Sequence, residues 1–193
     1  LVASANKVYD GTTTPGGGVS VQGLLGSDAL SATAGLGVLD SKDAGRRTVT
    51  FGGITLSGDP DTLANYVLPA DARFITTAEI ARAPLTISGA TTSLTYNAAT
   101  QTNAAPVITG LVAGETVSVT GLANGRNVGR YSDALVATAG DGTNLDNYAI
   151  TISNGSLTLT PFVLDLSGTS SSGPRLVASA NKVYDGTTTP GGG

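Results

Sequence analysis

Few side chains in this sequence are of types that carry out covalent chemistry. The chain contains no Cys and no His, so a thiol nucleophile and a histidine base are both excluded. Ser4 and Lys7 match the S-x-x-K spacing of serine acyl-transfer enzymes. That chemistry needs a helix to bring the two side chains together, whereas this segment leads into a strand-like run and no partner motif follows. A solvated Ser and Lys is the favoured interpretation, and we expect no enzymatic activity.

Carboxylates lie close together at Asp59 and Asp61, and a pair of this kind can serve glycoside hydrolysis. The two residues flank Pro60 in a turn, where Asp commonly bonds its own backbone, so turn chemistry is favoured. Oxygen ligands for calcium could come from Asp141, Asn144 and Asp146. This stretch lacks the spacing and final Glu of an EF-hand, and a turn is the stronger alternative. We therefore predict no metal and no cofactor, and keep these three residues as calcium candidates.

Lys7 is a candidate for a covalent crosslink. Some surface immunoglobulin-like domains join a Lys to an Asn or Asp beside a buried acid. Lys7 recurs as Lys182, but Leu94 stands at the corresponding place in the middle of the chain. The alternative is a Lys whose stem packs beside Tyr9 while its charge stays in water. An intact mass lower by one ammonia or one water would support the isopeptide.

The elements that must position these residues are organised by repetition. Residues 176–193 repeat residues 1–18 letter for letter, and the offset between Leu1 and Leu176 is 175 residues. A fixed period of this kind indicates a tandem array. A weaker repeat lies inside the period, where four blocks recur in the same order: 7–10 with 94–97, 19–24 with 106–111, 43–46 with 127–130, and 64–68 with 146–150. Two related domains of about 80 residues therefore follow one another. Asn65 and Asn147 each precede a Tyr, and we expect both side chains to bond the backbone of their loops.

The composition favours an all-β fold with short strands and tight turns. Gly accounts for 27 residues, while dispersed apolar residues reach 40%. The predicted strands are 19–22, 47–51, 54–57, 74–79, 85–88, 107–109, 117–121 and 134–138. Alternating residues on both sides of Asn154-Gly155 predict a hairpin that places Ile152 opposite Leu157. Single helical turns are expected within 27–32 and 112–115.

Charge argues against a nucleic-acid partner, and the length of the apolar runs argues against membrane insertion. The net charge is −4, and the Lys and Arg residues are scattered singly. Nucleic-acid binding needs a basic stripe, so no nucleic-acid partner is expected. No apolar run approaches the roughly 18 residues that span a bilayer, so we expect no membrane insertion. The first residues carry no signal-peptide pattern, and we expect any secretion signal to lie outside this sequence.

The predicted domains are 1–82, 83–161 and 162–193. The second domain opens with the strand at 85–88, whereas the equivalent stretch for the first domain stands near the other end of the chain, at 162–168. The first domain therefore lacks its opening strand, which leaves an unpaired sheet edge. We predict that Val163, Leu164, Asp165 and Leu166 of a neighbouring chain or repeat fill this gap by strand addition.

Two motifs are similar to known families. Residues 7–13, KVYDGTT, resemble the opening of the bacterial YDG domain. The segments 85–87, 94–96, 110–116 and 147–159 resemble the MBG (mostly bacterial immunoglobulin-like) domain. Such domains form tandem arrays in large secreted adhesins of the filamentous-haemagglutinin type. The resemblance implies tandem immunoglobulin-like sandwiches in an extended rod, with β-grasp-like domains carrying one short helix each as the alternative.

The resemblance carries over no catalytic residues and implies a secreted or cell-surface location. The expected function is a structural stalk or fibre repeat of a biofilm-matrix or surface adhesin, whose partners are neighbouring copies of the same repeat. One alternative is a filament subunit that assembles by strand complementation. Another is a module that binds surface glycans, matrix polymers or proteins. That module would need an aromatic platform, and Tyr131 is the one aromatic residue without an assigned place.

Overall fold

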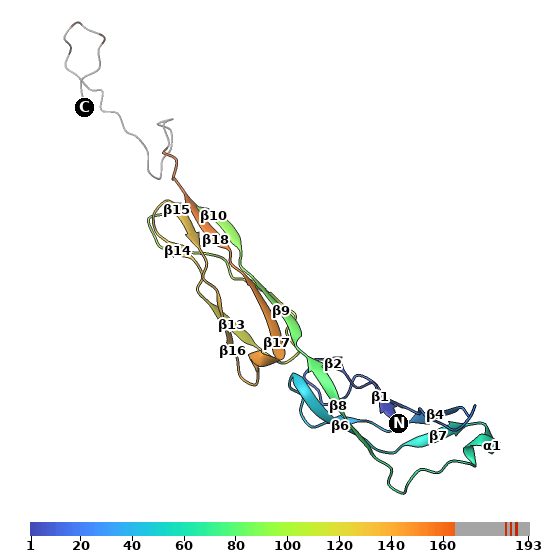
Figure 1. Cartoon of the computed structure of the whole chain (residues 1–193). Coiled ribbons are helices and arrows are strands. Elements are labelled where there is room, and N and C mark those ends of the chain that lie inside the picture. Colours follow the sequence, from blue (N-terminus) through green and yellow to red (C-terminus); the bar gives the residue numbers. More distant parts are fainter. Residues whose placement is uncertain (165–183, 185, 187, 189–193) are drawn as a thin grey trace.

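A computed structural model describes residues 1–164 together with residues 184, 186 and 188. The described chain is built from short strands, with one four-residue α-helix and one 3-10 turn, so the predicted all-β class is confirmed. Two groups of strands, within residues 1–82 and 83–161, lie end to end in an elongated molecule (Figure 1), and we refer to them as the first and second domains. Among the described residues, no helix has the length and apolar character needed to cross a membrane.

The first domain holds eight strands and the short helix. The elements are β1 (Val2–Ala3), β2 (Lys7–Val8), β3 (Val19–Ser20), β4 (Leu30–Thr33), β5 (Val38–Leu39), β6 (Gly45–Phe51), β7 (Thr55–Gly58), α1 (Pro60–Leu63) and β8 (Phe74–Ala81). The largest sheet has four strands in the order β2-β8-β6-β5, and β1-β3 and β4-β7 form two separate pairs. Asp59 caps α1, because its Oδ1 accepts the N–H groups of Asp61 and Thr62 at 3.1 Å.

The second domain holds ten strands in four small sheets, in the orders β12-β9-β17, β10-β18-β15, β13-β16 and β11-β14. Its elements are β9 (Ala83–Ser88), β10 (Thr91–Thr95), β11 (Gln101–Thr102), β12 (Val107–Thr109), β13 (Val117–Thr120), β14 (Asn124–Gly125), β15 (Gly129–Ser132), β16 (Val136–Ala139), η1 (Leu145–Asn147), β17 (Tyr148–Ser153) and β18 (Ser156–Thr160). The prediction for β12 is correct to the residue, and the other predicted strands overlap observed ones.

The predicted hairpin around Asn154-Gly155 is wrong. β17 pairs in parallel with β9, and β18 pairs in parallel with β10, so Ile152 faces Ile87 rather than Leu157. A type I′ turn needs positive φ at both central residues, and neither Asn154 nor Gly155 has it. Gly155 is needed here for close approach, since a Cβ on it would collide with the carbonyl oxygen of Ala90.

A buried polar cluster lies where the chain passes from one sheet to the next, from β9 to β10 and from β17 to β18. Asp133 is buried and accepts the N–H groups of Ala123 at 2.7 Å and Gly155 at 3.0 Å. Asn103 donates to both carboxylate oxygens of Asp133 and to the carbonyl oxygen of Ala90. Burial alone would raise the pKa of Asp133, but these hydrogen bonds outweigh it and lower the pKa. The bend at Asn154-Gly155 is therefore fixed by side chains far away in sequence.

The expected helical turns differ from the structure. A hydrogen bond from Asp28 N to Leu25 O closes a turn over 25–28, ahead of most of the predicted segment 27–32, and β4 begins at Leu30. The segment 112–115 likewise forms one closed turn, from Glu115 N to Val112 O. Each is a single turn closed by an i→i+3 hydrogen bond, and neither continues into a helix.

The internal repeat is visible in the strand register. Val8 pairs with Ala81, and the following Tyr9 N–H donates to Ala81 O at 2.8 Å. In the second domain Thr95 pairs with Thr160, and the following Tyr96 N–H donates to Thr160 O at 2.9 Å. The two Tyr residues therefore occupy the same backbone position in their domains.

Candidate functional site

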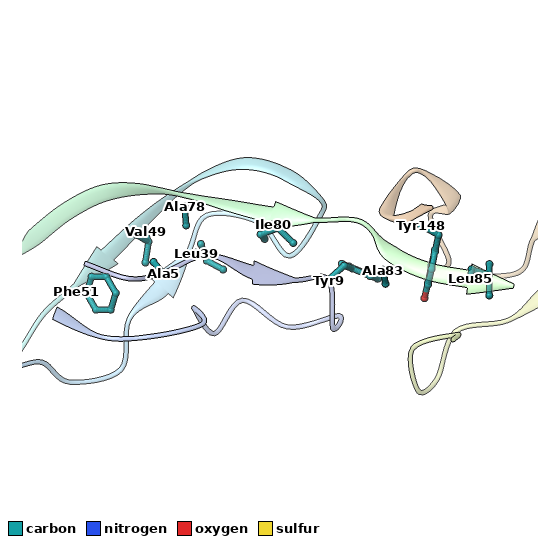
Figure 2. Close-up of a cluster of buried hydrophobic side chains, with 10 residues drawn as sticks. All are labelled: Ala5, Tyr9, Leu39, Val49, Phe51, Ala78, Ile80, Ala83, Leu85 and Tyr148. Atoms are coloured by element: carbon teal, nitrogen blue, oxygen red, sulfur yellow. The ribbon is translucent and has the colours of Figure 1, made fainter. Parts of the chain in front are cut away.

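The two domains meet without a separate linker. β8 ends at Ala81 and β9 begins at Ala83, so one extended segment leaves the first domain and opens the second. A single apolar cluster runs along this segment and draws on both domains, from Phe51 and Ile80 to Leu85 and Tyr148. Figure 2 shows its ten buried side chains in a row that crosses the boundary. We call this region the junction.

Two tyrosines and one carboxylate form the centre of the junction. Tyr9 of the first domain and Tyr148 of the second are 3% and 2% exposed, and their rings meet edge to face at 5.6 Å between centroids. The hydroxyl of Tyr9 donates to Glu115 Oε1, and that of Tyr148 donates to Oε2 at 2.6 Å. The Tyr148 oxygen also accepts the Val112 N–H at 3.0 Å. Every polar atom of this group thus has a partner.

Asn147 forms a second polar link between the domains. Its side chain is 1% exposed, accepts the Ala44 N–H at 2.8 Å and donates to Asp43 Oδ1 at 3.0 Å. Arg47 donates to the carbonyl oxygens of Asp43 and Ala44, which holds that loop in place. The expected side-chain-to-backbone bond of Asn147 exists, but it joins two domains. Asn65 lies just beyond α1, and its side-chain amide donates to Asp61 O at 3.1 Å.

Lys7 organises the loop that presents Tyr9. Its Nζ donates to Asp10 Oδ1 at 2.6 Å, to Thr14 O at 2.7 Å and to both Thr12 oxygens at 2.9 Å. Asp10 Oδ1 also accepts the Thr12 N–H at 2.9 Å. Gly11 sits between them with φ 78, a conformation that favours Gly, and a Cβ there would lie 3.1 Å from Val112. These contacts give the KVYDGT motif a physical role in shaping the face on which the second domain rests.

Burial and hydrogen bonds set the protonation of the junction. Desolvation, followed by the hydrogen bond to Glu115, raises the pKa of Tyr9 to about 12. The same two causes raise the pKa of Tyr148. The hydrogen bond from Asn147 is the largest cause that lowers the pKa of Asp43. The junction is therefore built for protonated tyrosines and an ionised Asp43, which is the state near neutral pH.

The other residues predicted from the sequence to form sites are Lys7, the calcium candidates at 141–146 and the strand segment 163–166. Lys7 lies nearest to the Asp10 carboxylate, and the isopeptide stays a prediction. Asn144 Oδ1 accepts the Asp146 N–H at 3.0 Å and caps η1, while no group of three or more His, Cys, Asp or Glu suited to a metal is found among the described residues. Val163 and Leu164 are exposed, whereas Asp165 and Leu166 lie outside the described residues.

Sequence reasoning missed the central contacts of the junction. Tyr9 and Glu115 are 106 residues apart, and nothing in their spacing connects them. The sequence does carry one signal for the tyrosine–carboxylate contact within each domain. An Asn-Tyr pair recurs at 65–66 and 147–148, and a Gly-Leu turn followed by an acidic residue recurs at 23–28 and 110–115. The structure shows that Tyr66 donates to Asp28 at 2.8 Å and accepts the Leu25 N–H at 3.0 Å, as Tyr148 does with Glu115 and Val112.

Tyr9 and the loop at 10–14 thus form a docking face in the first domain, and this part of the chain is similar to a known family. The YDG domain model matches residues 1–73. A YDG domain is present there. β8 continues the sheet of this YDG domain beyond the matched residues, to Ala81. No curated protein and no solved structure matches the chain.

Proposed function

We propose that this chain is a structural repeat of a secreted bacterial surface or matrix adhesin, in which a YDG domain and an MBG-like, immunoglobulin-like domain alternate as stiff segments of a stalk. The observation that carries the proposal is the junction. One strand segment passes through it without a linker, and a shared apolar cluster and a buried tyrosine–carboxylate group surround that segment. Domains joined by flexible linkers would move independently.

The physical consequence of such a junction is a fixed angle between domains. Stability in an array is then roughly the sum of domain terms and junction terms, and length grows by a constant step with each repeat. The work of the module is spacing, with no catalysis and no cofactor. The KVYDGT motif then has a mechanical role, because Lys7, Asp10 and Thr12 shape the loop against which the next domain rests.

A specific observation also favours strand complementation between repeats. β1 pairs with β3 in the antiparallel sense, as β9 pairs with β12 in the second domain. The rest of β9 has no counterpart among the described residues of the first domain. The segments that would flank it, 21–24 and 67–69, carry no strand pairing, and Val67 is 91% exposed. We propose that residues 163–166 of another repeat occupy this edge.

Tyr131, the aromatic residue considered for a glycan- or protein-binding surface, has a structural role instead. Tyr131 packs against the buried cluster of Ala123, Leu157 and Leu159, and its hydroxyl donates to Asn127 O at 2.8 Å. It supports the domain core, and a Cβ on Gly125 would collide with its ring. The spacer proposal therefore has the stronger physical support.

Chains with one, two, three and four copies of the 175-residue unit test the proposal. Small-angle X-ray scattering should give a maximum dimension that rises by the same increment for each added copy. A maximum dimension that grows much more slowly than copy number, as for flexibly linked domains, would contradict a stalk function.

A further inference from the structure

An apolar groove lies at the end of the second domain that is farthest from the YDG domain. It has a volume of about 600 Å³ and is lined by Tyr96, Ala98, Val128, Pro161, Phe162 and Leu164. Val128, Phe162 and Leu164 are 51%, 45% and 44% exposed. We call it the distal groove. Its lining residues stand next to β10, β15 and β18 in the sequence. Those strands lie at the end of the molecule opposite α1 (Figure 1).

The backbone around the distal groove corresponds to that of the YDG-domain face at the junction, although Leu94 stands there in place of Lys7. Tyr96 corresponds to Tyr9 by its hydrogen bond to the last residue of the paired strand. The turn after each Tyr is also the same: Asn97 Oδ1 accepts the Ala99 N–H at 3.0 Å, as Asp10 accepts that of Thr12. Ala98 has φ 65 where Gly11 has φ 78.

The remaining wall of the groove has a counterpart in the loop that holds Asn147. Gly129 pairs with Leu159 just as Gly45 pairs with Ile80, so Val128 corresponds to Ala44 and Asn127 to Asp43. Pro161 and Phe162 follow β18 as Arg82 and Ala83 follow β8. The groove therefore has the backbone of a docking face together with an exposed apolar surface.

The α1 end of the YDG domain carries the complementary group. Tyr66, Asp28 and Leu25 reproduce the bonds of Tyr148, Glu115 and Val112, but here Leu25 is 76% exposed and Asp28 is also exposed. Tyr66 uses Oδ2 of Asp28. Oδ1 corresponds to the Glu115 oxygen that accepts the Tyr9 hydroxyl at the junction.

We propose that the distal groove binds the α1 end of the YDG domain of another copy of this chain, and so forms a second junction on the plan of the first. Tyr96 donates its hydroxyl to Asp28, Leu25 enters the apolar groove, and the Asn65 amide pairs with Asn127 and the Val128 N–H. The contact is heterologous, joining two different ends, so it builds a linear array without closing. The same surfaces serve between successive repeats of one chain and between separate chains.

Three observations select this occupant. The chain leaves β18 at the groove and returns, at residues 176–193, to the sequence that opens a YDG domain. The two ends have matching bond patterns, and the existing junction shows what their union looks like. Apolar side chains are exposed at both ends, at Leu25 and Val67 on one and at Val128 and Phe162 on the other. This inference rests on the proposed stalk function, and it specifies the contact that joins one repeat of the stalk to the next.

Complementary variants of the full chain test the proposal. Val128→Asp disables the groove, Leu25→Asp disables the α1 end, and Val136→Asp is the matched control, since Val136 is 57% exposed at a site away from both ends. Sedimentation velocity should show head-to-tail oligomers that grow with concentration for the native and Val136→Asp chains. Each end variant alone should remain monomeric, and an equimolar mixture of the two should stop at a dimer.

Substitutions that remove only hydrogen-bonding groups should weaken the second junction without abolishing it. Tyr96→Phe and Asn65→Ala each remove hydrogen-bonding groups at the second junction, so each should raise the dissociation constant roughly tenfold while leaving the unfolding midpoint of the chain unchanged. A native chain that stays monomeric up to millimolar concentration would overturn the inference, as would loss of association in Val136→Asp. If the chain is monomeric but stiff at its first junction, the stalk proposal stands and this inference alone fails.

Discussion

Tyr9 and Tyr96 stand at the same position of two related domains, yet their surroundings are opposite. Both donate a backbone N–H to the last residue of a parallel strand, and both precede a turn with a left-handed residue. Tyr9 is buried against the next domain, whereas Tyr96 lines an open groove. The backbone position is shared, but at Tyr9 a neighbouring domain packs over the side chain, and Leu94 stands where Lys7 orders the first loop. The comparison teaches that this tyrosine position is buried where another domain packs against it, as at Tyr9, and lines an open groove at Tyr96.

The largest effect should come from truncating the two tyrosines. Tyr9→Ala removes a buried aromatic ring that belongs to the shared cluster, and should lower the free energy of unfolding by about 3–5 kcal/mol. Tyr96→Ala in the same chain at low concentration should cost less than about 1 kcal/mol, because its side chain is already partly in water. Urea unfolding followed by circular dichroism measures both. Equal costs would show that the two sites do not differ as described.

Alkaline pH should weaken the junction. The pKa of Tyr9 is raised to about 12 from 10.0, so folding favours the protonated hydroxyl. This contribution is fully present below a pH of about 10 and is lost as the pH rises through about 12. Tyr9→Phe removes the titrating group and should weaken the pH dependence in that window. A pH titration of tyrosinate absorbance, paired with scattering, would detect the change; a Tyr9 that ionises at its ordinary pKa would contradict the burial argument.

The two Asn-Tyr pairs offer a matched test of intermediate size. Asn147→Ala leaves the Ala44 N–H and one Asp43 oxygen without their partner, and should destabilise the chain by about 1–3 kcal/mol. Asn65→Ala removes one exposed bond to Asp61 and should change stability by no more than about 0.5 kcal/mol. Thermal unfolding of both variants is sufficient. If Asn65→Ala lowered the stability of the monomeric chain as much as Asn147→Ala does, the two Asn residues would not differ in the way proposed.

The turns after the two tyrosines should respond with opposite signs. Ala98 holds φ 65, which costs a non-Gly residue roughly 1–2 kcal/mol, so Ala98→Gly should stabilise the chain by up to about 1 kcal/mol after the entropic cost of Gly. Gly11→Ala should destabilise it by about 1–2 kcal/mol, because the new Cβ also meets Val112. Calorimetry resolves shifts of this size. Destabilisation by Ala98→Gly would argue against strain at that turn.

The sequence predicted the repeat and most strands, because both leave periodic traces in it. Strand 107–109 and the correspondence of blocks 7–10 and 94–97 required no long-range information. Asn154-Gly155 misled the prediction, since local propensity favours a hairpin there while Asp133 and Ala90 hold a different path. The Tyr9–Glu115 contact could not be predicted, because only the folded second domain brings the two side chains together.

The stiffness of the first junction is the central claim, and a distance measurement tests it directly. The chain has no Cys, so Val38→Cys and Val136→Cys, both exposed and in different domains, accept spin labels at those two sites alone. Pulsed electron paramagnetic resonance should give one narrow distance distribution, which Tyr9→Ala broadens. A native chain with a distribution as broad as that of Tyr9→Ala would show that the domains move freely, and would contradict the account.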